Sequence, residues 1–193
     1  MKDDKSAPES VRRMDVAESR EGARKARSAR PAPRTELASP TPQSGETQQL
    51  LNGLLADEFV TYVRTLNWHW NVRGMQFHSL HAFFEKLYQE QAVRIDDIAE
   101  KVRSMGGFAT ATMEEFLGNS RLKEKIGEPP DPRVMISTLA GDHEAIIKRL
   151  REILGTLGEK FDDPSTDNFL CDLLEKHEKT LWMLQAHLDR ELG

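Results

Sequence analysis

The sequence predicts an all-α protein whose folded part is a four-helix bundle. From Thr47 onward, large apolar residues recur at spacings of three and four, which is the period of helices with one buried face. No segment shows the two-residue alternation of a strand, and Gly and Pro gather between the apolar segments. Four long helices joined by such breaks are typical of a bundle.

The first two predicted helices follow one another closely. Apolar residues over Leu51–Leu66 define a helix that runs to about Val72, and Gly74 ends it. The second helix carries apolar residues over Leu80–Met105 and stops at Gly106-Gly107. Because only a short turn separates them, the end of the first helix lies across from the start of the second.

A long connection leads to the last two predicted helices. It holds a short amphipathic helix around Thr112–Leu117, whose Thr-x-x-Glu start is a capping box. The third helix opens at Pro129–Pro132 and extends through Leu157, and the fourth starts at Asp163-Pro164 and continues to Leu188. The short helix could therefore ease a long crossover between the second and third helices.

The N-terminal part of the chain differs in composition from the rest. Residues 1–46 are rich in Arg, Ala, Ser and Pro, so we predict a disordered tail ahead of a folded domain over residues 47–193. The tail holds ten Lys/Arg and eight Asp/Glu, a charge of +2, which leaves −7 for the rest of a chain at −5. Its positive charge is clustered between positions 20 and 34, where six basic residues face only Glu21. These are Arg20, Arg24, Lys25, Arg27, Arg30 and Arg34.

Composition also limits the compartment. The one cysteine, Cys171, excludes an intrachain disulfide and favours a reducing environment. No apolar run approaches the roughly 20 residues that span a bilayer, so we expect no membrane partner. The N-terminus lacks the apolar segment of a secretory signal. These features predict a cytoplasmic protein.

The second predicted helix carries a stripe of potential metal ligands. At about 100° per residue, four polar residues fall within about 100° of one another and turn away from the apolar face. They are His81, Glu85, Asp96 and Glu100. Such stripes are ordinarily solvated charged faces, but each i,i+4 pair can aim two donor atoms at one point. Carboxylates and imidazoles together are ligands for iron and similar divalent ions.

Spacing shows that one chain cannot complete the site. Residues 81 and 96 are about 22 Å apart along the axis at 1.5 Å per residue, so one ion cannot bind both pairs. His69 lies just across the turn from His81 and can join the first pair. The second pair would come from a neighbouring subunit related by a two-fold axis, which gives two equivalent intersubunit sites per dimer.

Several motifs occur together at specific spacings. HWNVRG at 69–74 is followed by His81, Glu85, Asp96-x-x-x-Glu100, Gly106-Gly107 and HEKTLWMLQAHL at 177–188. With them the chain resembles the Dps family, the mini-ferritins, over roughly residues 48–192. The resemblance implies a ferritin-like four-helix bundle with a short helix in the second connection, assembled as a hollow dodecamer. It also implies a bacterial ferroxidase that oxidises Fe(II), preferably with hydrogen peroxide, and stores the Fe(III) mineral inside.

The resemblance further assigns roles to single residues. One subunit supplies His69, His81 and Glu85, and its two-fold mate supplies Asp96 and Glu100. Trp70 lies beside the iron, where quenching radicals and packing at the dimer interface are equal alternatives. Acidic residues at the start of the fourth helix line iron-entry pores in the family, with Asn168 here at a position usually occupied by Asp. The pore candidates are Asp163, Asp167 and Asp172.

The remaining histidines and the tail complete these expectations. No histidine follows a glutamate by three residues, so the in-bundle di-iron site of ordinary ferritins is absent. His143, His177 and His187 have no carboxylates aimed with them and are expected in packing or solvent, and His78 is expected to lie outside the ligand set. Cys171 is expected to be buried, and Trp182 to be a core or interface residue. The basic tail is expected to bind double-stranded DNA non-specifically and thus to associate with the nucleoid.

Two other function classes compete with an iron-oxidising enzyme. One is a DNA-compacting structural protein of the nucleoid with vestigial iron chemistry, and the other is a helical oligomer with neither role. A degenerate site should have lost at least one ligand, whereas His69, His81, Asp96 and Glu100 are all present. Absorbance after adding Fe(II), with peroxide and then with air, separates the iron-oxidising enzyme from the other two classes.

Overall fold

The computed structural model describes residues 42–124, 126–160 and 163–189, which form five helices and no strand. The helices are α2 (Pro42–Asn71), α3 (Phe77–Ser104), α4 (Met113–Asn119), α5 (Pro132–Lys160) and α6 (Pro164–Leu188). The predicted all-α class and the four long helices are confirmed. The first helix begins at Pro42 rather than at the expected Thr47. The tail prediction for residues 1–41 lies outside the described residues.

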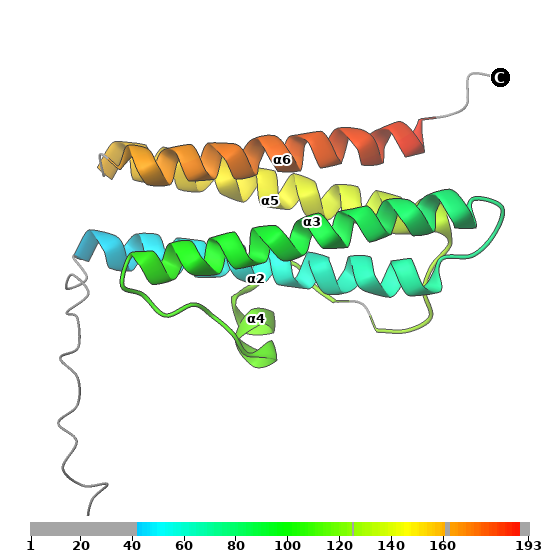
Figure 1. The fold of residues 1–193 in the computed structure, drawn as a ribbon, viewed down its shortest axis with the longest axis horizontal. Coiled ribbons are helices and arrows are strands. Elements are labelled where there is room, and N and C mark those ends of the chain that lie inside the picture. The colour runs from blue at the N-terminus through cyan, green and yellow to red at the C-terminus, as the bar shows by residue number, and fades with distance from the viewer. Residues whose placement is uncertain (1–41, 125, 161–162, 190–193) are drawn as a thin grey trace, which may run out of the picture. The chain divides into compact units, whose positions relative to one another are not determined.

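The four long helices form two antiparallel pairs, α2 with α3 and α5 with α6 (Figure 1). Contacts between α2 and α5 join the two pairs into one bundle. The chain leaves α3 at one end of the bundle and enters α5 at the other, so the connection runs along its length (Figure 1). Helix α4 lies in this connection, where the sequence predicts a short helix, and it packs against α2.

Local residues set the helix ends as the sequence predicts. Gly74 and Gly106 adopt φ values of 103° and 82°, a left-handed conformation that glycine takes without steric cost. Thr112 caps α4 by accepting from the Glu115 backbone N–H, while the Glu115 carboxylate accepts from the Thr112 N–H in return. The carboxylate of Asp163 caps α6 by accepting from the backbone N–H groups of Ser165 and Thr166.

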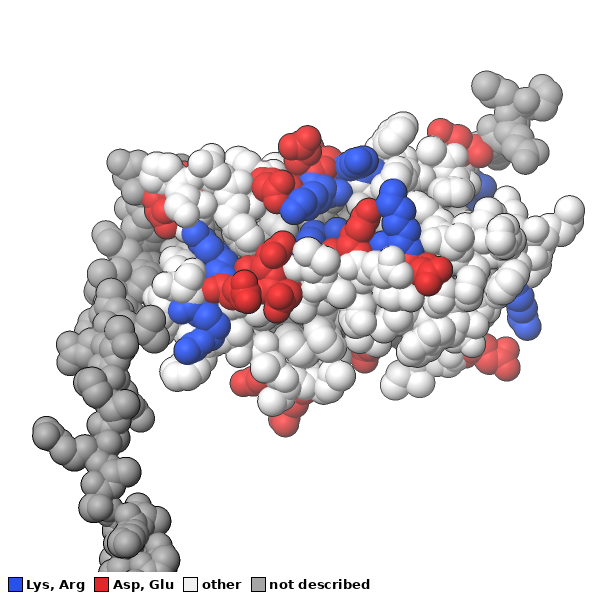
Figure 2. All heavy atoms as spheres, viewed as in Figure 1, with Lys and Arg blue, Asp and Glu red and all other residues white. Residues whose placement is uncertain are grey.

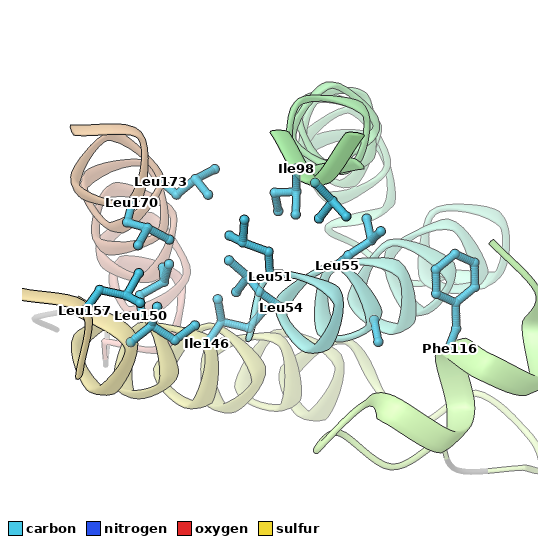
Figure 3. Close-up of a cluster of buried hydrophobic side chains, with 13 residues drawn as sticks. Leu51, Leu54, Leu55, Ile98, Phe116, Ile146, Leu150, Leu157, Leu170 and Leu173 are labelled. Atoms are coloured by element: carbon cyan, nitrogen blue, oxygen red, sulfur yellow. The ribbon is translucent and has the colours of Figure 1, made fainter. Parts of the chain in front are cut away.

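Two apolar clusters fill the bundle, one toward each end of its helices. Figure 3 shows the first, in which Leu51 and Leu54 of α2 point toward Ile98 of α3 and toward side chains of α5 and α6. The second cluster includes Trp68 of α2 and Phe84 of α3, together with residues of α5 and α6. Between the two clusters, all four long helices contribute buried polar residues.

A buried aspartate fastens the long connection to α2. Asp57 forms an ion pair with Arg149 of α5 and accepts hydrogen bonds from the Ser120 hydroxyl at 2.8 Å and the Arg121 backbone N–H at 2.7 Å. Nearby, the Phe116 ring of α4 stacks on Phe59 of α2 with 4.0 Å between the ring centroids. The segment that follows α4 is therefore held at a fixed place on the bundle.

One expectation about α6 is corrected by the structure, and another is narrowed. Cys171 is exposed rather than buried, because it follows the core residue Leu170 and projects from the outer side of the helix. Trp182, for which the sequence predicts the core or an interface, is 66% exposed, which excludes the core of its own chain and leaves the interface as a prediction. No helix in the described part of the chain combines the length and apolar character needed to cross a membrane.

Candidate metal centre

His69, near the end of α2, and His81, near the start of α3, face each other across the turn that joins the helices. Their rings stack with centroids 3.8 Å apart. His69 Nδ1 lies 2.9 Å from the backbone carbonyl oxygen of His81, and His81 Nδ1 lies 2.8 Å from the carbonyl oxygen of His69. The turn therefore brings together two residues that are twelve positions apart, as the sequence predicts.

These reciprocal hydrogen bonds select the ring tautomer. A carbonyl oxygen can only accept, so both Nδ1 atoms must carry the proton and donate it. In a neutral imidazole the other nitrogen, Nε2, then keeps its lone pair for a ligand. A hydrogen bond from the distal ring nitrogen to a carbonyl is the usual way in which proteins orient a metal-binding histidine. The two histidines are thus prepared to coordinate a cation through Nε2.

The carboxylates of the stripe lie on the outer side of α3. Glu85, Asp96 and Glu100 are all exposed, in agreement with the angular calculation that turns them away from the apolar face. Within the described part of a single chain, no three His, Cys, Asp or Glu side chains come together as a metal-binding group. His69 and His81 are therefore close to each other, but no carboxylate in the described part of their own chain forms a three-residue group with them.

Large apolar side chains are exposed beside the two histidines. Trp70 is 69% exposed, and Met75 in the adjoining turn is fully exposed. The Phe77 ring, also exposed, stacks on His81 with 5.1 Å between centroids. Clusters of exposed apolar side chains of this kind are typical of surfaces that associate with another protein.

The predicted pore residues lie at and after the start of α6. Asp163 is committed to capping the helix, and its carboxylate also accepts from the Thr166 hydroxyl, which lowers its pKa. Asp167 is half-buried, and the exposed Asp172 pairs with Lys176 at 2.6 Å. The basic residues between positions 20 and 34 lie outside the described residues. Of the other histidines, His78 and His187 are exposed.

The expectation for His143 and His177 is wrong in one respect, because both belong to a buried charged cluster. His177 of α6 contacts the Glu58 carboxylate of α2, and its Nδ1 lies 2.8 Å from Nδ1 of His143 on α5. Arg94 of α3 completes the cluster, with Nε 3.4 Å from Glu58 Oε1. Each long helix thus contributes one residue, and none is more than 3% exposed.

The cluster perturbs the titration of its members. Burial alone would raise the pKa of Glu58, but the charges of His177 and Arg94 outweigh it and lower that pKa from 4.5 to about 2. Burial, together with the charges of His177 and Arg94, holds the pKa of His143 well below 6.5. At neutral pH, Glu58 is therefore ionised and His143 is neutral.

A sequence signal for this cluster exists at heptad spacing. Each of its four members stands seven residues after a buried apolar residue of its own helix, which places it on the inward face. The four preceding residues are Leu51, Leu87, Ile136 and Leu170. The sequence interpretation sought carboxylates near each histidine along the chain, and so it missed Glu58, which is contributed by a different helix.

Known proteins resemble the chain in sequence and in fold. The ferritin-like domain family matches residues 48–192. A Bacillus anthracis protein, DNA protection during starvation protein 2, is 36% identical over 143 residues, which cover 74% of this chain and 96% of that protein. A low temperature-induced protein from Nostoc is 39% identical over 157 residues, covering 81% of this chain and 88% of that protein.

Solved structures agree with these relatives. A Dps protein from Bacillus brevis has a TM-score of 0.73 and 35% identity, covering 77% of this chain and 99% of that one. The Dps protein of Vibrio cholerae, described as a member of a broad superfamily of ferritin-like diiron-carboxylate proteins, has a TM-score of 0.73 and 31% identity over 76% of this chain and 91% of that one. The chain belongs to the Dps family of the ferritin-like superfamily.

Proposed function

We propose that the protein is a ferroxidase and iron-storage protein, which oxidises Fe(II) at sites shared between two subunits. The observation that carries this proposal is the reciprocal hydrogen bonding of His69 and His81, which leaves both Nε2 atoms available to a metal ion. Glu85 lies one turn further along α3. Fe(II) is the substrate of this site, and the histidines and Glu85 are its ligands from one subunit.

The remaining ligands are Asp96 and Glu100 of a two-fold mate. Both are exposed on α3, with Asp96 about 22 Å and Glu100 about 28 Å along the helix from His81 at 1.5 Å per residue. The exposed side chains of Trp70, Met75 and Phe77 supply an apolar surface for the contact between subunits. An antiparallel arrangement about a two-fold axis completes two such sites at once.

The donor set suits the oxidation. Carboxylate oxygens are hard ligands that stabilise Fe(III) more than Fe(II). Hydrogen peroxide is the proposed oxidant: two Fe(II) ions each give up one electron, and peroxide with two protons becomes two water molecules. Because peroxide takes both electrons, no hydroxyl radical is released, which protects nearby DNA. Where a one-electron side reaction does form a hydroxyl radical, the exposed Trp70 next to His69 can donate an electron to it and quench it before it escapes.

We further propose that twelve copies close into a hollow cage that holds the Fe(III) mineral. The relatives with solved structures are Dps proteins, and the expected particle mass is 264 kDa, or 12 times 22.0 kDa. Sedimentation of the purified protein measures this mass directly. Asp167 and Asp172 are the proposed pore residues, since the Asp163 carboxylate is already used as a helix cap. A ring of such acids would concentrate Fe(II) by its field.

Subunit mixing tests the shared site. His81→Ala and Asp96→Ala proteins should each oxidise Fe(II) slowly in stopped-flow absorbance measurements with peroxide. After the two are dissociated and assembled together, mixed dimers hold one site built from two unmutated halves, and part of the activity should return. If mixed dimers form and no activity returns, the ligands do not come from two subunits. Glu144→Ala, which alters an exposed carboxylate of α5, is the matched control and should oxidise iron at the normal rate.

A second proposed activity is non-specific binding of double-stranded DNA by the tail. Residues 20–34 carry six basic residues and one acid, whereas residues 47–193 carry a net charge of −7. Each arm neutralises few phosphates, but a cage with many arms gains avidity. Arginine binds phosphate without reading sequence. A relative from Bacillus anthracis is named for DNA protection during starvation.

Gel-shift titrations at several salt concentrations test the tail. The full-length protein is compared with a variant that lacks residues 1–37 and with one whose six basic residues at positions 20–34 are changed to Gln. Loss of binding in both variants, with iron oxidation unchanged, supports the proposal. Equal retardation of DNA by all three proteins would show that DNA binding does not depend on the tail.

A further inference from the structure

A pocket of about 270 Å³ opens between α3 and α6, away from the paired histidines. Four of its lining side chains are basic and one is acidic. The basic ones are Lys86, Arg94, Lys176 and Lys179, and the acidic one is Glu90. Figure 2 shows Lys and Arg side chains gathered over the middle of the face formed by α3 and α6, with acidic side chains among them. The pocket wall is therefore predominantly cationic.

Arg94 is the most deeply buried of the four basic lining residues, and it also belongs to the buried cluster. Its side chain is only 4% exposed, and its Nε faces Glu58 at 3.4 Å. The Nη2 group makes no hydrogen bond within the part of the chain that the structure describes. A guanidinium is always charged, and a buried N–H donor without an acceptor is unfavourable. The Nη2 atom is itself shielded from solvent, so Arg94 adds its positive charge to the pocket rather than a direct hydrogen bond to an ion in it.

The three lysines differ in how far neighbouring acids neutralise them. Lys176 pairs with Asp172 at 2.6 Å, and Lys86 pairs loosely with Glu90 at 3.8 Å. Lys179 is exposed and forms no ion pair or hydrogen bond with any described residue. Four basic groups, less Glu90, Glu58 and Asp172, leave a net charge of +1 around the pocket. One divalent oxyanion therefore meets an excess of positive charge.

We propose that this pocket binds inorganic phosphate or a chemically similar tetrahedral oxyanion. Lys179 and Lys86 donate from the rim, and Arg94 adds its positive charge from below. Lysine ammonium groups act as point charges that donate charge-assisted hydrogen bonds to phosphate oxygens. The volume is below the roughly 300–1,000 Å³ of pockets that bind larger organic ligands, so a free ion fits better than a nucleotide.

The placement of the pocket on α3 connects it to the candidate metal centre. With His81 at zero and about 100° per residue, its α3 residues lie at about 120° to 220°, directly next to the ligand stripe at about 0° to 100°. Lys86 also follows the proposed iron ligand Glu85 in the chain. A bound phosphate would thus sit on the neighbouring face of the same helix, where it is available to Fe(III) as the mineral forms.

Calorimetric titration of the iron-free, assembled, full-length protein with inorganic phosphate tests the pocket. We expect saturable binding of one phosphate per chain at moderate ionic strength. Lys179→Gln should weaken it about tenfold or more, as expected for the loss of a charge-assisted hydrogen bond. Lys148→Gln removes the same charge from an exposed site on α5 and should change the affinity less than twofold.

Other outcomes would overturn the proposal. Absence of saturable binding would do so, and so would an equal loss in the Lys148→Gln control, which would indicate general attraction to a charged surface. Titration with adenosine triphosphate separates the two sources of phosphate, and tighter binding of the nucleotide than of the free ion contradicts the assignment. Circular dichroism and sedimentation confirm that each variant is folded and assembled. Because no iron is present, failure here leaves the proposed ferroxidase untouched.

Discussion

Arg94 of α3 and Glu58 of α2 form an ion pair at the centre of the bundle, with both side chains almost completely shielded from solvent. His177 of α6 contacts the same carboxylate oxygen of Glu58. In such a place each charge is tolerated because of the others, since an isolated buried charge is strongly unfavourable. The cluster therefore makes the stability of the bundle sensitive to single changes at its centre.

The two partners of this ion pair should be energetically coupled. Arg94→Met leaves the Glu58 carboxylate with less compensation and should lower the free energy of unfolding by about 3–5 kcal/mol. Glu58→Gln combined with Arg94→Met should cost clearly less than the sum of the two single changes. Chemical denaturation at one fixed protein concentration measures all four proteins. Additive costs would show that the two residues are not coupled.

The stability of the protein should fall as the pH drops below 6.5. The folded chain keeps His143 neutral because its pKa lies well below 6.5, whereas the unfolded chain takes up a proton there. The unfolded state then binds more protons, so the free energy of unfolding decreases as the pH falls, by up to about 1.4 kcal/mol per pH unit for one group. Glu58 adds to this loss below 4.5, down to its folded pKa of about 2.

The His143→Gln variant separates this contribution from those of the other histidines. Denaturation at several pH values between about 8 and 5 should give a smaller slope for the variant than for the unchanged protein. His78→Gln, at an exposed position, is the control and should keep the full slope. An unchanged slope for His143→Gln would mean that this residue does not titrate differently in the folded and unfolded states.

Gly53 in α2 should not tolerate alanine, although alanine favours helices. A Cβ there would collide with the Arg149 guanidinium, which donates to the Gly53 carbonyl at 2.7 Å and pairs with Asp57. Gly53→Ala should therefore lower the melting temperature. Gly141→Ala in α5 has open space around the new Cβ and should raise stability by up to about 1 kcal/mol. Thermal unfolding of the pair distinguishes steric conflict from helix propensity, and a stabilised Gly53→Ala protein would contradict the close packing of Arg149.

Loss of the α4 cap should loosen the long connection more than the bundle. Thr112→Ala removes the side-chain acceptor for the Glu115 N–H and should cost about 1 kcal/mol, within a usual range of about 0.5–2 kcal/mol. Amide hydrogen exchange should accelerate over Met113–Asn119 and stay slow in the buried turns of α2. Thr156→Ala, inside α5, removes a hydroxyl without a cap and should leave α4 unchanged. Uniform acceleration would indicate global rather than local destabilisation.

The helices were predictable because their signals are local. Each signal determines the backbone conformation only within a few residues of its own position. These signals are the spacing of apolar residues, Gly74, the Thr112 capping box and Asp163. The contact between His69 and His81 was also predictable, since a short turn between two helices leaves few alternatives. The hydrogen bonds of each ring to the opposite carbonyl were not, because they depend on the exact crossing of two backbones.

The charged cluster could not be predicted from single helices. Glu58 and His177 are far apart in sequence, and each looks like an isolated polar residue on an apolar face until α2 and α6 are packed together. The exposure of Cys171 shows the reverse error, in which an apolar type suggested burial but the helical position turned it outward. Residue type alone does not decide the side of a helix on which a residue lies.

The central charged cluster also has a consequence for helix sliding. A shift of α3 along α2 by one turn, about 5.4 Å, would withdraw Arg94 from Glu58 and set both charges against the leucines of the adjoining apolar clusters. A purely leucine-rich helix contact would resist a one-turn shift less than this ion pair does, because the shift would move each leucine into the place of another leucine. The same shift would part His69 from His81 at the end of the helices. The ion pair at the centre of the bundle thus fixes the axial position of α3 relative to α2, which keeps the two imidazoles opposite each other.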